Sequence, residues 1–274
     1  MKPSRMIPFS RFAIAVSMLA AFALTASLAT ATPIAIALTG NTSTDGWTNA
    51  SLTIGSNSGF PGFPGTGAWP RPIESVVGGD AQLVKIANGT GGGPYPAGGS
   101  IYYGGFSGEA NTNGGTLAVT DATPVADLAN VLFQIEIGEA WTYDFFNHEL
   151  PTLTYSFESG NATIGATAWK VIEKVENGTV EMPTGPDGAM QDEPIYLNTY
   201  LLQWDLSGVT ETITGISISF TAVQHAQLYA LQLDQSSVYT QHALLAAVPE
   251  PATYAAIIGG LALVGVMILR RRKA

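Results

Sequence analysis

The chain has 274 residues, of which 12% are charged, and it contains 31 glycines and no cysteine. The lack of cysteine excludes disulfides, thiolate metal sites and cysteine nucleophiles. Seven of the 11 basic residues lie within the first eleven or last five positions, so residues 32–247 carry four basic and twenty acidic residues. Because DNA, RNA and anionic lipid surfaces are bound by clustered positive charge, this balance argues against a nucleic-acid partner.

The N-terminal 31 residues are predicted to be a secretory signal peptide. Three basic residues are followed by an apolar stretch, 12–28, and then by Ala29 and Ala31, which supply the small side chains that signal peptidase requires. We expect cleavage immediately before Thr32. An uncleaved membrane anchor is the alternative, because the apolar stretch is long for a signal peptide.

The segment from residue 51 to residue 120 is rich in Gly, Ser, Thr and Asn. Residues 60–65 and 91–94 combine Pro with Gly, a pairing typical of turns because Pro fixes φ and Gly accepts positive φ. A short strand is expected between these turns at 81–86, and two more after them, at 100–103 and 116–119.

After Pro124 the alternation of apolar and polar residues becomes stronger. Phe133, Ile135 and Ile137 share one face of an expected strand. The strands expected in this half are 131–137, 153–158, 168–175, 195–206, 216–221 and 227–234, and residues 125–128 could form a short helical turn. Many strands, frequent turn residues and no long helical period predict an all-β sandwich of jelly-roll type.

The sandwich is expected to form one domain over residues 32–247. A split at Thr123–Pro124 is the alternative, although it would leave a Gly-rich first half with few core residues.

The C-terminal segment, 248–274, has three parts in a fixed order. Pro249, Glu250 and Pro251 come first, an apolar run follows, and the chain ends with a basic cluster. A helix over 252–269 would span about 27 Å at a rise of 1.5 Å per residue, enough for a thin bilayer. The terminal cations Arg270, Arg271, Arg272 and Lys273 would stay cytoplasmic as a retention charge.

This tripartite order resembles the PEP-CTERM sorting signal. The resemblance implies that exosortase, a membrane protease-transpeptidase, recognises Pro249, Glu250 and Pro251 and releases the protein outward. Residues 200–235 are similar to the conserved end of PEP-CTERM sandwich proteins, which implies the fold and no particular activity. The alternative is an ordinary single-pass tail in which Pro-Glu-Pro occurs by chance.

No sequence motif predicts a catalytic residue or a bound metal. The G-x-S-x-G motif of serine hydrolases is incomplete at both candidate serines: Ser107 lacks the second glycine, and Ser58 is out of frame. We therefore interpret both as loop serines. The three histidines have no metal-ligand spacing and are expected to be hydrogen-bonded at strand ends or in loops: His148, His225 and His242.

Acidic residues could serve glycoside cleavage as a pair of carboxylates, but the sequence favours no pair over a solvated acidic surface. The carboxylates nearest the expected strands are Glu136, Glu139, Asp144, Glu149, Glu158, Asp205 and Asp234. Asp187, Asp192 and Glu193 could hold Ca²⁺, although the Asp-x-Asp-x-Asp-Gly spacing is absent and we predict no cofactor.

Aromatic residues carry the more informative pattern. Exposed Trp side chains on a sandwich can stack on the C–H faces of sugars. Trp47 and Trp69 lie in expected loops and are the candidate glycan contacts, whereas Trp169 and Trp204 lie in expected strands and are predicted to be core.

Together these features predict an exported, non-enzymatic cell-surface or extracellular-matrix protein that exosortase sorts and cleaves. Its expected partners are signal peptidase, exosortase, the membrane before processing, and extracellular polysaccharide. A secreted lyase or glycoside hydrolase on the same sandwich, and a purely structural coat protein, are the alternatives.

Overall fold

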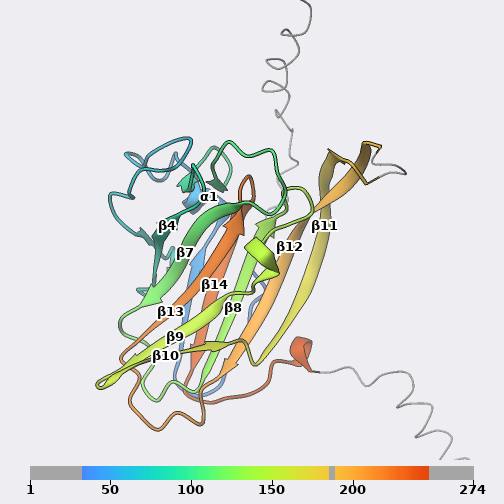
Figure 1. Ribbon diagram of the computed structural model, residues 1–274. Helices are drawn as coiled ribbons and strands as arrows, with labels where there is room; N and C mark the ends of the chain where they lie inside the picture. The colour runs from blue at the N-terminus through green and yellow to red at the C-terminus, as the bar shows by residue number, and fades with distance from the viewer. Residues whose placement is uncertain (1–32, 185–188, 247–274) are drawn as a thin grey trace, which may run out of the picture. The chain divides into compact units, whose positions relative to one another are not determined.

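Two antiparallel β-sheets make up nearly all of the regular structure (Figure 1). The structure is a computed structural model that describes residues 33–184 and 189–246. The strands are β1 (Thr42–Trp47), β2 (Ile73–Glu74), β3 (Val77–Gly78), β4 (Gln82–Asn88), β5 (Pro94–Pro96), β6 (Ile101–Tyr103), β7 (Asn113–Asp121), β8 (Asn130–Gly138), β9 (Thr152–Phe157), β10 (Gly160–Gly165), β11 (Ala168–Met182), β12 (Gln191–Asp205), β13 (Gly215–Val223) and β14 (Gln227–Ser236). The helical segments are one turn each: α1 (Asn49–Leu52), η1 (Phe146–His148) and η3 (Ala243–Leu245).

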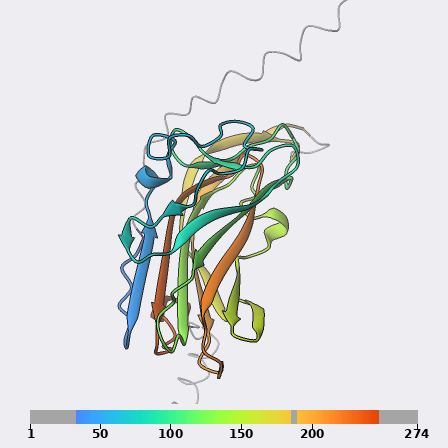
Figure 2. The same ribbon diagram turned by 90° about the vertical axis from the view of Figure 1, so that its left-hand side faces the viewer.

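The first sheet has the strand order β11-β12-β8-β14-β1-β3, and the β5–β6 hairpin joins it through β14. The second sheet has the order β10-β9-β13-β7-β4-β2. The two sheets lie face to face, as the view turned by 90° also shows (Figure 2). Phe133 of the first sheet contacts Phe220 of the second, with ring centroids 6.0 Å apart, so the core lies between the sheets.

Period-2 alternation explains which residues enter this core. Along β8, the fully buried Val131, Phe133, Ile135 and Ile137 belong to the core cluster, because side chains two residues apart share a face of a strand. The same pattern places Ile216, Ile218 and Phe220 of β13 in that cluster. The two sheets are therefore held together mainly by apolar burial.

The outer face of the first sheet is covered by the ends of the described chain. Leu132 and Leu201 form a second apolar cluster with Leu245 of η3, and Ile36 and Leu38 pack against it. As a result every residue of β8 is buried, including the polar residues on its outer face.

The sandwich architecture and nine strand positions agree with the sequence prediction. The expected strands correspond to β4, β6, β7, β8, β9 and β11 to β14. Residues 125–128 form a turn and no helix. The sequence pattern missed β1, whose residues TSTDGW show no apolar alternation, and β10, which contains two glycines.

The predicted signal peptide 1–31, with Ala29 and Ala31, and the predicted helix 252–269, with Pro249–Pro251 and the basic tail 270–273, lie outside the described residues. Within residues 33–184 and 189–246, no helix combines the length and the apolar character needed to cross a bilayer.

Trp169 corrects one prediction about the core. Trp204 is fully buried as expected, but Trp169 is 52% exposed. Its partner in the register is Leu202, so it lies on the inner face of the first sheet. The exposure arises because β11 is the outermost strand of that sheet.

We predict that Trp204→Ala destabilises the protein by about 3–5 kcal/mol, because it leaves a large cavity between the sheets. Trp169→Ala, on the neighbouring strand β11 but with an exposed side chain, should change the unfolding free energy by about 0.5 kcal/mol or less. Urea unfolding of both variants measures the difference. Equal losses would contradict the assignment of Trp169 to the surface.

Candidate functional site

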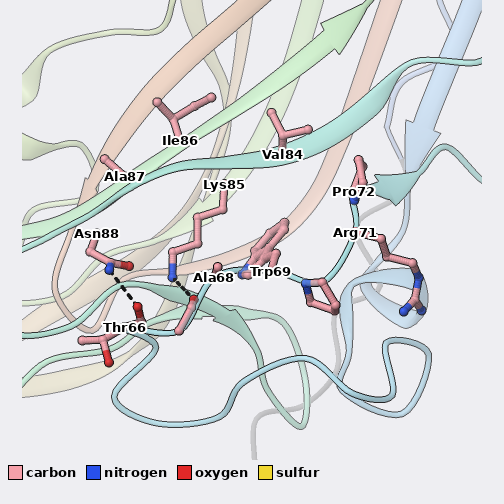
Figure 3. A pocket seen from close by; sticks show the side chains of 12 residues that line it. Thr66, Ala68, Trp69, Arg71, Pro72, Val84, Lys85, Ile86, Ala87 and Asn88 are labelled. Atoms are coloured by element: carbon pink, nitrogen blue, oxygen red, sulfur yellow. Dashed lines mark hydrogen bonds between the residues drawn. The ribbon is translucent and has the colours of Figure 1, made fainter.

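A hollow with a volume of about 500 Å³ lies between a loop and strand β4 (Figure 3). Residues 66–72 form one wall and residues 84–88 of β4 form the other. Its size lies within the range of small-ligand sites, about 300–1,000 Å³. The lining combines an indole, two basic side chains and an amide: Trp69, Arg71, Lys85 and Asn88.

Two side chains of β4 fix the loop that forms the hollow. The Lys85 ammonium donates to the carbonyl oxygen of Gly65 and to that of Gly67, the latter at 2.9 Å. Asn88 Nδ2 donates to the Thr66 carbonyl at 2.8 Å (Figure 3). Gly65 has a φ of +84°, and a Cβ there would collide with the Gly93 carbonyl, so the turn requires glycine.

Burial of the Lys85 side chain lowers its pKa to about 8, because desolvation disfavours the charged amine. Two carbonyl acceptors nevertheless suit an amine in either protonation state, since both states carry N–H donors. Lys85 therefore serves as a hydrogen-bonding anchor for the loop.

Trp69 is held rigidly at the side of the hollow. Its Nε1 donates to the Pro94 carbonyl at 2.9 Å, and its ring meets Phe60 edge-on with centroids 5.3 Å apart. Arg71 places its guanidinium 5.1 Å from the centroid of the same Phe60 ring. The half-buried Trp69 thus lines a preformed hollow, as a stacking contact to a ligand requires.

Trp47, the other predicted glycan contact, is fully buried. It ends strand β1, and its Nε1 donates to the Ile73 carbonyl at 3.0 Å inside the core. A residue with no exposed surface cannot contact a polysaccharide, so the prediction for Trp47 is wrong.

The hollow offers a ligand apolar contact and the positive charge of Arg71, because the N–H groups of Trp69, Lys85 and Asn88 already donate to backbone carbonyls. No carboxylate occurs among the lining residues 66–72 and 84–88. The paired carboxylates of glycoside hydrolysis are therefore not supplied at this place.

Several of the candidate acids stabilise the fold instead. Asp144 is 5% exposed and accepts hydrogen bonds from Tyr200 at 2.6 Å and from Asn198 at 3.0 Å. Glu139 accepts from Asn198 at 2.8 Å and forms an ion pair with Lys174 at 3.6 Å. Through these contacts both carboxylates link the β8–β9 connection to strands β11 and β12.

Of the other candidate acids, Asp205 accepts hydrogen bonds from Ser207, and Asp234 accepts hydrogen bonds from Thr44 and Gln232. Glu149 and Glu158 are exposed. Glu136 lines a separate cavity of about 20 Å³, which is too small for a sugar ring.

The histidines are hydrogen-bonded or stacked. His225 lies 2.6 Å from the Tyr102 hydroxyl and 2.9 Å from the Ser107 carbonyl. His242 accepts from the Leu244 amide at the start of η3, and His148 stacks on Tyr143 with centroids 4.5 Å apart.

The three acidic residues considered for Ca²⁺ are not seen to form a common site in the described part of the chain. Asp192 is exposed and Glu193 accepts from the Thr184 hydroxyl, while Asp187 lies outside the described residues. Among the residues that the structure describes, no group of three or more His, Asp or Glu side chains is arranged to hold a metal ion.

An exposed aromatic pair was missed by the sequence analysis. Phe63 and Phe106 are 54% and 75% exposed and meet edge-on with centroids 5.0 Å apart. The doubled Phe-Pro-Gly at 60–65 was the available signal. Its first Phe is buried against Trp69 and its second is exposed.

We predict that Lys85→Met destabilises the protein by about 1–3 kcal/mol, because the Gly65 and Gly67 carbonyls lose their donor. The unfolded chain binds more protons than the native chain between pH 8 and 10.5, so the wild type should gain stability as pH rises through that window. The variant should lack this gain. Denaturant titrations across pH measure both effects, and Lys170→Met on exposed β11 is the control. A Lys85→Met protein as stable as this control would contradict the anchoring role.

The hollow is built by contacts of the 66–72 loop with β4, and its lining residues are the only structural indication of its ligand. No family model, no curated protein and no solved structure matches the chain.

Proposed function

We propose that this protein is an exported cell-surface or matrix protein, sorted and cleaved by exosortase, whose sandwich associates with extracellular polysaccharide. The observation that carries the proposal is the order of the C-terminal segment. Pro249, Glu250 and Pro251 are followed by an apolar run and then by four basic residues. Because proline disfavours regular helix, we expect Pro249 and Pro251 to leave Glu250 in an extended segment that an enzyme can reach.

The place of this segment in the sequence, after the last element of the folded body, supports the proposal. The last described element, η3, ends at Leu245, whose side chain packs with Leu132 and Leu201. Cleavage near Pro249 would therefore leave both sheets and their apolar cover intact. An exported protein released at this point would keep its fold.

We further propose that the sandwich is of jelly-roll type. The order β1-β14-β8-β12 in the first sheet and β7-β13-β9-β10 in the second supports it, because two interleaved Greek keys give this arrangement. The additional strands, among them β11, β4 and β2, extend the sheets at their edges.

Polysaccharide association is supported by the hollow beside Trp69. Arg71 and Lys85 line it, and they are two of the four basic residues between positions 32 and 247. In a domain with twenty acidic residues, this local positive charge supports binding of saccharides that bear anionic groups. The apolar walls at Val84 and Ile86 complement the C–H faces of a sugar.

We predict that the mature protein begins at Thr32 and ends between Val248 and Pro251, and that this form is lost from cells without exosortase. Glu250→Gln should block the processing, whereas Glu211→Gln, an exposed acid of the sandwich, should not. Mass spectrometry of protein from cells and medium measures the ends. An intact C-terminus with and without exosortase would contradict the sorting proposal.

We predict that Trp69→Ala weakens binding to the extracellular polysaccharide of the producing cells about tenfold, equivalent to ~1.4 kcal/mol. Arg71→Ala, which disturbs less packing, should weaken it in the same direction, while Trp169→Ala serves as the exposed-tryptophan control. Co-sedimentation with the isolated polysaccharide measures binding after circular dichroism has verified folding.

Equal binding by all three variants and the wild type would contradict the proposed role of the hollow. New reducing or unsaturated sugar ends in the same mixtures would favour the polysaccharide-cleaving alternative.

A further inference from the structure

Two buried aspartates project into the core from opposite sheets. Asp45 lies on β1 of the first sheet and is fully buried, and Asp121 ends β7 of the second sheet and is 3% exposed. Asp45 shares a strand face with Trp47, and Asp121 shares one with Val119, and both of these apolar residues belong to the core cluster. Each sheet therefore contributes one acid to the space between the sheets.

The connection between β3 and β4 brings these two acids to the same place. It carries the chain from the first sheet to the second, and its Ala81 amide donates to Asp45 Oδ1 at 3.0 Å. Because Gln82 pairs with Thr120 in the antiparallel ladder, Ala81 is the next residue in the register and stands opposite Asp121. The Asp45 carboxylate thus reaches the second sheet beside Asp121.

The second oxygen of Asp45, Oδ2, is an acceptor without a donor. It is buried and has no hydrogen-bond partner among the described residues, and a Cβ at Gly79 would collide with it. Desolvation by burial raises the pKa of Asp45, although the Ala81 amide lowers it. The charges of Asp121 and Asp80 raise it as well. A buried carboxylate beside other carboxylates is costly unless a cation joins them.

The four basic residues of the described chain do not supply that cation. None of them forms an ion pair with either aspartate within residues 33–184 and 189–246. Lys170 and Lys174 lie on β11, which β12, β8 and β14 separate from β1. Lys85 donates to carbonyls of the 65–67 loop, and Arg71 lies over an aromatic ring. A cation at the two aspartates therefore has to come from solution.

Asp121 keeps free acceptor capacity for such a cation. Its Oδ1 accepts from the Thr123 amide at 2.7 Å and its Oδ2 accepts from Gln235 at 2.6 Å. An ionised carboxylate has about four acceptor sites, so Asp121 can accept these two bonds and still bind an ion. The Thr123 hydroxyl also donates to the exposed Asp80 at 2.6 Å, which adds negative charge at the rim of the pair.

Burial and oxygen chemistry favour Ca²⁺ over other cations. Ca²⁺ accepts carboxylate and neutral oxygens in flexible geometry, whereas Mg²⁺ requires a near-ideal octahedron and retains several waters. No group of three His, Asp or Glu ligands occurs in the part of the chain that the structure describes, so neutral oxygens have to complete a site built on two carboxylates. The Ser75 hydroxyl beside Asp45 and the backbone carbonyls of residues 78–80 are the neutral oxygens of this region.

We propose that Ca²⁺ binds between Asp45 and Asp121 and thereby joins the two sheets at the edge where the chain passes from one to the other. None of the acids that the sequence suggested for Ca²⁺ is part of this site. Extracellular modules bind Ca²⁺ with dissociation constants of about 0.1–1 mM, so an exported sandwich would take up the ion outside the cytoplasm and gain stability there. The inference does not depend on cleavage by exosortase.

The test compares thermal unfolding with and without the ion. Protein purified from producing cells is stripped with EGTA and melted in EGTA, in CaCl₂ at about 10 mM, which exceeds the dissociation constants of extracellular Ca²⁺ sites, in MgCl₂ and in NaCl of equal ionic strength. Ca²⁺ should raise the Tm of wild type by about 3–10 °C over EGTA, the shift that such constants give for a domain of this size. Mg²⁺ and NaCl should raise it by about 1 °C or less.

Asp45→Asn separates ion binding from a purely structural role, because its effect should change sign between the two conditions. In EGTA the variant should melt at or above the wild-type Tm, since it removes an unpaired buried carboxylate. In CaCl₂ it should melt below wild type, because it has lost a charged ligand. Asp121→Asn should also lose the response to Ca²⁺. Asp144→Asn, which changes a buried acid bound to Tyr200, is the control and should keep the wild-type response.

Isothermal titration calorimetry measures binding directly in the same proteins. Wild type and Asp144→Asn should bind a single Ca²⁺, and Asp45→Asn should bind none. A wild type that binds no Ca²⁺ and melts at the same temperature in CaCl₂ and EGTA overturns the inference, and Asp45 is then held as a neutral acid. A Ca²⁺ response that persists in Asp45→Asn and Asp121→Asn also overturns it, because the ion then binds elsewhere. Neither result bears on the proposed sorting.

Discussion

Burial of strand β8 on both of its faces is the constraint on which the rest of the structure depends. Toward the second sheet its residues are apolar and enter the core. On the other face the sequence places Leu132, Gln134 and Glu136, and the polar pair among them needs partners once water is excluded. The amide and carbonyl of Ile34 meet this demand for Gln134, whereas Oε2 of Glu136 has no hydrogen-bond partner among the described residues. Segments that look like tails in the sequence are thus parts of the sandwich.

The hollow beside Trp69 lies near the β4–β2 edge of the second sheet and depends on hydrogen bonds between a strand and a loop. Strand β4 lies next to the outermost strand of the second sheet, and its Lys85 points into backbone carbonyls of the 65–67 loop. One amine with several donors can bind two carbonyls at once. The wall that holds Trp69 therefore depends on a residue of another element, Lys85 of β4, through hydrogen bonds from the strand to the loop.

The sequence predicts the strands well where apolar residues alternate, because alternation reports directly which face is buried. It misses β1, since TSTDGW shows no alternation and is buried by neighbours on both sides. The same error moved Trp47 from core to loop. For Trp169 the sequence correctly predicts the inner face of the strand but not its exposure. That exposure depends on how far the facing sheet extends beside the outermost strand β11. The two cavities could not be predicted, because each joins residues of separate segments through side-chain contacts.

The small number of residues between η3 and the Pro-Glu-Pro sequence would constrain the proposed release mechanically. Leu245 is packed on the first sheet, and four residue steps separate it from Pro249, which a fully extended chain covers in at most about 14 Å. A membrane-embedded enzyme acting on Glu250 would have to work almost against the folded body, with little slack to draw the bond inward. The shape of the folded surface near η3 would then affect whether the enzyme can reach the bond that it cleaves. Adding residues between Ala246 and Pro249 would relax a steric requirement, and deleting them would have to unfold part of the sheet's apolar cover.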